Sequence, residues 1–257
     1  MNKTKISWCD YTWNPITGCS EISEGCQNCY AKALSKRFGW AWGDPVRHGD
    51  RLKEPRKLKK PAKIFVCSMS DLFHEKIHNE WINQVIDVIE KNPQHTFIIL
   101  TKRPERMKRY FCGVQLPENA WLGVTVENQK RADERIPILM EIPAKVRFVS
   151  CEPLLEEINL NLCVECQLEP EKCHEHNKID WVIAGGETGL KARYCDSGWI
   201  IKLWQDCGKN NIPFHFKQWG ESDEFRNPFK DIPLEAQIDI FEEIEEIEET
   251  KQFPEVS

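Results

Sequence analysis

The pattern that decides the fold lies in residues 63–103, KIFVCSMSDLFHEKIHNEWINQVIDVIEKNPQHTFIILTKR. Two short apolar runs, Lys63–Cys67 and Thr96–Leu100, are rich in β-branched and aromatic residues, which is typical of buried strands. Between them, Asn79–Lys91 places its apolar side chains on one face of a helix. A strand, a helix and a second strand in this order predict a parallel βαβ unit.

The same alternation continues on both sides of this unit. Further strands are expected at Lys5–Cys9, Trp121–Val126, Val146–Ser150, Trp181–Ala184 and Pro213–Lys217. Helices are expected at Cys29–Phe38, Gln129–Met140 and Ser197–Lys209, the last with Ser197 as its N-cap. The sequence therefore predicts an α/β fold, a partial or irregular parallel (β/α) barrel of TIM type. A doubly wound open sheet is the alternative.

The composition of the chain limits the classes of protein to which it can belong. The chain has 257 residues, of which 40% are hydrophobic and 30% charged, so a packed core is expected. We find no run of eighteen apolar residues, and the start, MNKTKISWCDYTW, lacks the apolar core of a signal peptide. These features predict a cytoplasmic protein that does not enter a membrane.

The charge is unevenly distributed along the chain. The net charge of −6 argues against a general nucleic-acid coat, but residues 51–63 and 102–109 are strongly basic. We expect residues 51–63 to border the functional site and to guide a phosphate-bearing substrate. We divide the chain into a barrel over residues 1–221 and an acidic C-terminal extension over residues 222–257.

The first cysteine cluster follows the first expected strand, in WNPITGCSEISEGCQNCYAKAL at residues 13–34. Its spacing is Cys19-x6-Cys26-x2-Cys29. Three thiolates hold three irons of a four-iron cluster and leave the fourth iron open for a reactant. A structural zinc site, with Cys9 or His48 as the fourth ligand, is the alternative.

A second cluster lies in a small Cys-rich insert at residues 163–176, CVECQLEPEKCHEH. Three cysteines and one histidine match a closed tetrahedral zinc site. The candidate ligands are Cys163, Cys166, Cys173, His174 and His176. A second iron–sulfur cluster, or no metal, remain alternatives.

Polar and ionisable residues follow almost every expected strand. In a parallel barrel these carboxyl ends share one face, so we expect one common cavity. The candidate catalytic residues are Asp71, Lys102, Glu152 and Glu187. The candidate cofactor-binding residues are Ser68, Ser70, Asp71, Thr101, Glu152, Gly185, Gly186 and Glu187. For Asp71 an N-cap role is equally open, and the GGETG run at 185–189 is alternatively a simple turn.

The cysteine loop after the first strand resembles that of radical S-adenosylmethionine (SAM) enzymes, which carry three cysteines there. The resemblance implies a [4Fe-4S] cluster, bound SAM and an electron donor protein. It also implies that the end of the second strand, Ser68–Asp71, binds the ammonium group of SAM.

A second resemblance, to a phage-associated family of unknown function, covers roughly residues 6–221. It is carried by TWNPITGC, GCQNCYA, SMSDLFHE, LTKRPERM, WLGVTVEN, CEPLL, DWVIAGGETG and FKQWGE.

The leading functional hypothesis is therefore a radical SAM enzyme that cleaves SAM reductively and modifies a nucleic acid or nucleotide. A zinc-binding nucleic-acid-interaction protein without catalysis is the first alternative. The second is a hydrolase or nuclease that uses Asp71, Glu152 and Glu187 around a divalent cation.

Overall fold

The computed structural model describes residues 1–40, 42–160, 179–189, 191–221, 246–247 and 249–255. Within these residues an eight-stranded sheet has the order β1-β2-β5-β6-β7-β8-β9-β10. The strands are β1 (Asn2–Lys3), β2 (Tyr11–Trp13), β5 (Lys63–Val66), β6 (Thr96–Thr101), β7 (Ala120–Thr125), β8 (Arg147–Cys151), β9 (Trp181–Gly185) and β10 (Phe214–Gln218). A separate hairpin pairs β3 (Ile16–Thr17) with β4 (Val46–Arg47).

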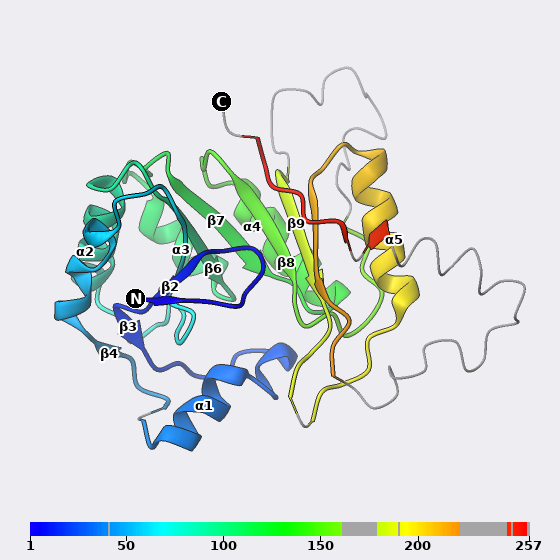
Figure 1. The fold of residues 1–257 in the computed structure, drawn as a ribbon, viewed down its shortest axis with the longest axis horizontal. Coiled ribbons are helices and arrows are strands. Elements are labelled where there is room, and N and C mark those ends of the chain that lie inside the picture. The colour runs from blue at the N-terminus through cyan, green and yellow to red at the C-terminus, as the bar shows by residue number, and fades with distance from the viewer. Residues whose placement is uncertain (41, 161–178, 190, 222–245, 248, 256–257) are drawn as a thin grey trace, which may run out of the picture.

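The order of the strands in the sheet follows their order in the chain. Strand β1 is antiparallel to β2, and every later neighbouring pair is parallel. A doubly wound sheet reverses its strand order at a switch point, and this sheet does not, so that alternative is wrong. The structure is mixed α/β, with a mostly parallel sheet that curls into a half-barrel flanked by helices (Figure 1).

The predicted strands from Lys63–Cys67 onward are confirmed to within one residue at each end. The first predicted strand, Lys5–Cys9, is wrong, because this segment turns with the Cys9 N–H donating to the Ile6 carbonyl, and the strand is β2. The run is apolar for another reason: Trp8 is buried on the inner face of the sheet, where its ring lies 4.7 Å from that of Phe65.

The helices are α1 (Tyr30–Phe38), α2 (Asn79–Glu90), α3 (Pro104–Phe111), α4 (Gln129–Met140) and α5 (Ser197–Lys209). The predicted helices are confirmed, except that α1 begins one residue later and α2 ends one residue earlier. The N-cap of α5 is Asp196 rather than Ser197, because the Asp196 carboxylate accepts the Gly198 N–H at 2.7 Å. Helix α3 was not predicted, although Met107, Tyr110 and Phe111 bury one face of it.

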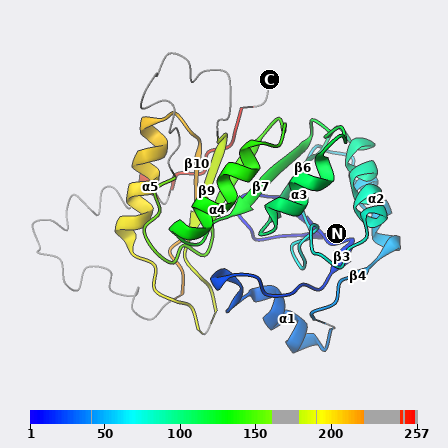
Figure 2. The ribbon, with the colours of Figure 1, turned by 180° about the vertical axis from the view of Figure 1, so that it is seen from behind.

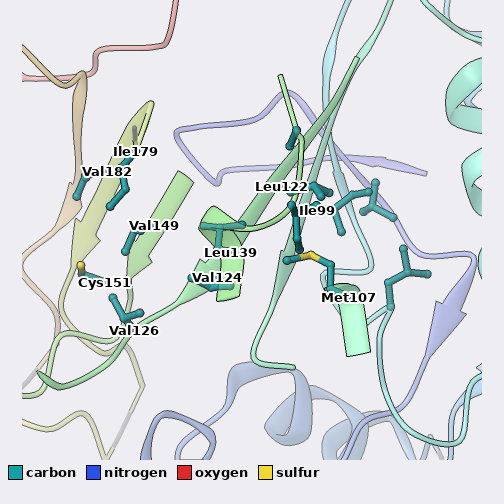
Figure 3. Packing of buried hydrophobic residues seen from close by; sticks show 14 of the residues in the cluster. Ile99, Met107, Leu122, Val124, Val126, Leu139, Val149, Cys151, Ile179 and Val182 are labelled. Atoms are coloured by element: carbon teal, nitrogen blue, oxygen red, sulfur yellow. The ribbon is translucent and has the colours of Figure 1, made fainter. Parts of the chain in front are cut away.

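Helices α3 and α4 cover the outer face of the sheet (Figure 2). Figure 3 shows Met107 of α3 and Leu139 of α4 directed toward strand residues such as Leu122 and Val149. All four side chains are fully buried, so this layer contributes the apolar burial that fixes the helices against the sheet.

The inner face of the sheet is filled by aromatic rings. We call Trp8, Phe65, Trp121, Phe148 and Trp181 the aromatic cluster. Each of these residues is at most 7% exposed, and the Trp181 ring lies 5.6–6.5 Å from the rings of Trp8, Trp121 and Phe148. Gly123 leaves room for this packing, since a Cβ there would overlap the Phe148 ring.

Two predicted regions fall wholly or partly outside the described residues. The insert at 163–176, with its proposed zinc ligands, is one, and residues 222–245 of the acidic extension are the other. The described end of that extension lies beside β10, where the Phe216 N–H donates to the Thr250 carbonyl at 3.0 Å. Among the helices that the structure describes, none has the length and apolar character needed to cross a membrane.

Candidate functional site

A cavity of about 200 Å³ lies between the cysteine loop, residues 19–29, and the carboxyl ends of the parallel strands. The candidate residues from these strand ends that line it are Ser68, Ser70, Asp71, Thr101, Lys102, Glu152, Gly186 and Glu187. Helix α1, which follows the cysteine loop, lies beyond this end of the sheet (Figure 1). Residues far apart in the sequence are thus brought to one site, although their chemical roles remain predictions.

The three cysteines of the loop line the same cavity and are all partly exposed. Within the described residues, no group of three or more His, Cys, Asp or Glu side chains is arranged to hold a single metal ion. Burial raises the pKa of the Cys19 thiol to about 11, an effect that the Arg103 guanidinium opposes from 3.7 Å. A metal must therefore displace the proton of Cys19 in order to bind there.

The cysteine loop is fixed to β7 and α4 by a buried carboxylate that the sequence analysis did not single out. Glu127 is 0% exposed, and its Oε1 accepts the Gly25 N–H at 3.2 Å. Its Oε2 accepts a hydrogen bond from Arg135 Nη1 at 2.8 Å. A Cβ at Gly25 would lie 3.1 Å from the Glu127 carboxyl carbon, so glycine permits this close approach.

Glu187 anchors the other end of the loop. The Asn28 amide donates to Glu187 Oε2 at 2.9 Å, and Arg193 donates to both carboxylate oxygens, at 2.9 Å from Nε and 2.5 Å from Nη2. Burial opposes ionisation, but these hydrogen bonds outweigh it and hold the pKa of Glu187 below its usual value. Arg193 also donates to the Glu24 carbonyl at 3.1 Å, so the pair connects β9 with the cysteine loop.

Asp71 and Arg103 form a third buried connection. Asp71 accepts four hydrogen bonds, from the Thr101 hydroxyl and from the N–H groups of Phe73, Lys102 and Arg103, the last through Nη1 at 3.1 Å. Arg103 Nη2 donates to the carbonyl and the hydroxyl of Ser20, at 3.0 and 3.2 Å. Asp71 caps its own turn rather than helix α2, whose N-cap is His78.

Glu152 and Lys217 pair across the cavity wall, with 2.5 Å between Oε1 and Nζ. Lys102 also lines the cavity, and within the described part of the chain no carboxylate pairs with its ammonium. Trp8 lines it too, and its buried Nε1 has no hydrogen-bond partner there. The Lys102 ammonium is thus a cation of the cavity that an anionic group of a ligand is able to pair with.

Ser68 and Ser70, which follow β5, hydrogen-bond to the chain segment that leads into the cysteine loop. Ser70 donates to the Ile16 carbonyl at 2.9 Å, and Ser68 exchanges hydrogen bonds with the Asn14 side chain. Both hydroxyls are therefore already engaged by the chain itself.

The glycines of the GGETG run approach the chain's own backbone. A Cβ on Gly186 would overlap the Trp219 carbonyl, and one on Gly185 would lie 3.2 Å from the Gln218 carbonyl. Gly185 does not line the cavity. These two residues allow the ends of β9 and β10 to lie close together, and the cofactor-binding role of Gly186, which lines the cavity, stays a prediction.

The basic stretch also differs from expectation, since none of residues 51–63 lines the cavity. Part of this stretch precedes β5, at the opposite end of the strand from the cysteine loop. Arg51 instead donates to the Asn14 carbonyl at 3.0 Å and accepts the Trp13 indole N–H through its own carbonyl.

Fold and site together define an α/β half-barrel protein with a cysteine-lined cavity at the carboxyl ends of its parallel strands. A comparison with known families matches residues 3–249 to the family described as "Protein of unknown function (DUF5131)". The chain belongs to this family. Searches of curated proteins and of solved structures found no match.

Proposed function

We propose that the cavity binds an iron–sulfur cluster and SAM, and that the protein is a radical SAM enzyme. The observation that carries the proposal is that Cys19, Cys26 and Cys29 line one cavity at the carboxyl ends of parallel strands. The resemblance of the loop to that of radical SAM enzymes supplies the reaction class.

The residues present fit such a cluster. Each thiolate of a four-iron cluster binds a different iron, so the three sulfurs need not surround one ion. Gly18, with φ of 92°, lets the chain turn as it enters the loop, and Gly25 lets the loop approach Glu127 closely. The loop is also held in place from three directions, through Glu127, Glu187 and Arg103.

When bound at these cysteines, a reduced cluster would supply the electron that reductive cleavage of SAM requires. The chain's own residues bind and orient the reactants. The Lys102 ammonium suits the carboxylate of SAM, and Glu152 suits its ribose hydroxyls. The apolar wall of Trp8, Phe65 and Leu100 excludes water from the reacting atoms.

The carboxylates of the hydrolase alternative already have cationic partners. Asp71 pairs with Arg103, Glu152 with Lys217 and Glu187 with Arg193. A divalent cation would have to displace these partners before it bound. This arrangement favours the cysteines over the carboxylates as the metal-binding side of the cavity.

The test is anaerobic reconstitution with iron and sulfide, followed by reduction with dithionite in the presence of SAM. We expect 5′-deoxyadenosine and methionine to form in equal amounts. The Cys29→Ala variant should form neither, while Cys112→Ala should behave as wild type because Cys112 is exposed and outside the cavity. A reconstituted wild-type protein that leaves SAM intact contradicts the proposed reaction.

A further inference from the structure

Two aromatic rings lie exposed at the end of α1. Phe38 and Trp40 are 55% and 54% exposed, and their rings stack with centroids 5.2 Å apart and planes 25° from parallel. We call this pair the aromatic platform. Large aromatic side chains usually gain stability by burial, so an exposed stacked pair marks an interaction surface.

The backbone holds the platform in place. Gly39, with φ of 66°, ends α1, and the Trp40 N–H donates to the Ser35 carbonyl at 2.9 Å. This is a Schellman motif, in which the residue after the glycine usually packs back on its own helix. Here that residue is Trp40, and its ring lies against Phe38 in solvent. The platform is therefore formed before any partner binds.

The surroundings of the platform are cationic. Helix α1, YAKALSKRF, carries three basic residues and no acidic one. The Arg37 guanidinium lies 5.6 Å from the centre of the Phe38 ring. Among the described residues, no carboxylate forms an ion pair with Lys36 or Arg37. In a chain with net charge −6, such a local cluster favours an anionic partner.

The platform is also connected to the cavity. The Gly43 N–H donates to the Cys19 carbonyl at 3.0 Å, so the chain that leaves the platform returns to the cysteine loop. Tyr30, at the start of α1, and Trp42, two residues after the platform, both line the cavity. The platform is thus joined to the cavity wall by short stretches of chain on both sides.

We propose that the platform binds single-stranded nucleic acid, with a base stacked on an outer face of the Phe38–Trp40 pair and phosphates near Lys36 and Arg37. Aromatic faces combined with cations match the way in which proteins bind single strands. A duplex keeps the faces of its bases covered by their neighbours, so it does not offer the same contact. The binding stands on its own, while the delivery of a nucleotide to the cavity for reaction rests on the function proposed above.

The test is the fluorescence anisotropy of a labelled mixed-sequence oligonucleotide, prepared as single-stranded DNA, single-stranded RNA and duplex DNA. We expect single strands to bind more tightly than the duplex. Phe38→Ala and Trp40→Ala should each weaken binding roughly tenfold or more, since stacking of a base on an aromatic ring has about this effect. Arg37→Glu should weaken binding and reduce its dependence on salt.

Matched controls are Val114→Ala, an exposed apolar residue elsewhere, and Lys209→Glu on α5, which should change little. The Cys26→Ala variant should keep oligonucleotide binding while it loses iron, which separates this proposal from the proposed reaction. Unchanged affinity in Phe38→Ala and Trp40→Ala, or tighter binding of the duplex, contradicts the proposal. The proposal is also contradicted if the protein binds no oligonucleotide and instead self-associates through Trp40.

Discussion

The cysteine loop and the aromatic cluster lie at the same cavity but are held in opposite ways. The loop is fixed by hydrogen bonds and charges, through Glu127, Glu187 and Arg103. The aromatic cluster contributes Trp8 and Phe65 to the cavity wall and is fixed by apolar burial. The net stability from one hydrogen bond is about 1 kcal/mol, whereas a buried aromatic side chain contributes several times as much.

This difference separates folding from function in the molecule. Changes in the aromatic cluster should lower the stability of the whole fold most. Changes at the buried ion pairs that hold the loop should cost less, and changes at residues that only line the cavity should mainly alter what it binds. Variants at the two regions should therefore lose different amounts of stability.

The largest effect is expected from Trp181→Ala. Trp181 is 0% exposed and contacts several rings of the aromatic cluster, so its truncation leaves a cavity in the inner core. The free energy of unfolding should fall by roughly 3–5 kcal/mol, measured by urea denaturation. The matched control Trp40→Ala, at an exposed tryptophan, should change it by about 0.5 kcal/mol or less. Equal losses in the two variants contradict the assignment of this core.

A smaller loss is expected from Glu127→Gln. The glutamine keeps an acceptor for the Gly25 N–H but leaves the buried Arg135 guanidinium without its counter-charge. We expect a loss of about 3 kcal/mol in urea denaturation. Glu134→Gln, which removes one of the two exposed partners of Arg131 and leaves Glu24, should cost less than about 0.5 kcal/mol. A Glu127→Gln protein as stable as wild type would falsify the anchoring role.

The sequence predicted the sheet well, because each apolar run from Lys63–Cys67 onward is a buried strand of the half-barrel. The prediction of a strand at Lys5–Cys9 was wrong. A short run that contains Trp8 has the same apolar pattern whether it forms a strand or a turn that covers the core. The sequence placed Glu187 at a strand end but gave no sign that Arg193, six residues later, occupies both of its oxygens.

Two anchors of the cysteine loop were not selected from the sequence. Glu127 and Arg103 were visible only as polar residues after strands, and their partners Gly25 and Ser20 lie far away in the chain. The sequence feature that could have identified these anchors is a charged residue directly after an apolar strand. Its pairing depends on the three-dimensional approach of the loop, which no local pattern encodes.

The pH dependence of the free energy of unfolding should reveal the burial of His215 on the inner face of the sheet. His215 is 0% exposed, and burial, with help from nearby lysines, lowers its pKa from 6.5 to about 4. Between pH 6.5 and pH 4 the unfolded chain binds a proton at His215 more readily than the folded chain does. The stability that comes from keeping this imidazole neutral is therefore complete above about pH 6.5 and is lost as the pH falls toward 4.

The slope from this group should reach up to about 1.4 kcal/mol per pH unit in urea denaturation. His215→Phe should flatten the profile in this window. Ser7→Ala, which removes only the hydroxyl that lies 2.8 Å from His215 Nε2, should keep it. A wild-type profile that is flat from pH 6.5 to pH 4 would mean that the imidazole is not held neutral.

The smallest effect on stability is expected from Lys102→Met. This ammonium has no carboxylate partner among the described residues, so its loss should change the free energy of unfolding by about 0.5 kcal/mol or less. If SAM binds as proposed, its KM should rise roughly tenfold, because the proposed charge-assisted contact between Lys102 and the SAM carboxylate would be lost. Lys108→Met, on α3 and outside the cavity, serves as the control. An unchanged KM places the carboxylate of SAM elsewhere.

The most direct test of the account is the iron content of the anaerobically reconstituted chain, with and without the cysteines of the loop. We predict a brown protein that loses about four iron ions per chain in each of Cys19→Ala, Cys26→Ala and Cys29→Ala, while Cys112→Ala keeps them. The difference between variants isolates this site from any metal bound at residues 163–176. Iron content that is equal in wild type and in all three loop variants would contradict an iron–sulfur cluster at these cysteines.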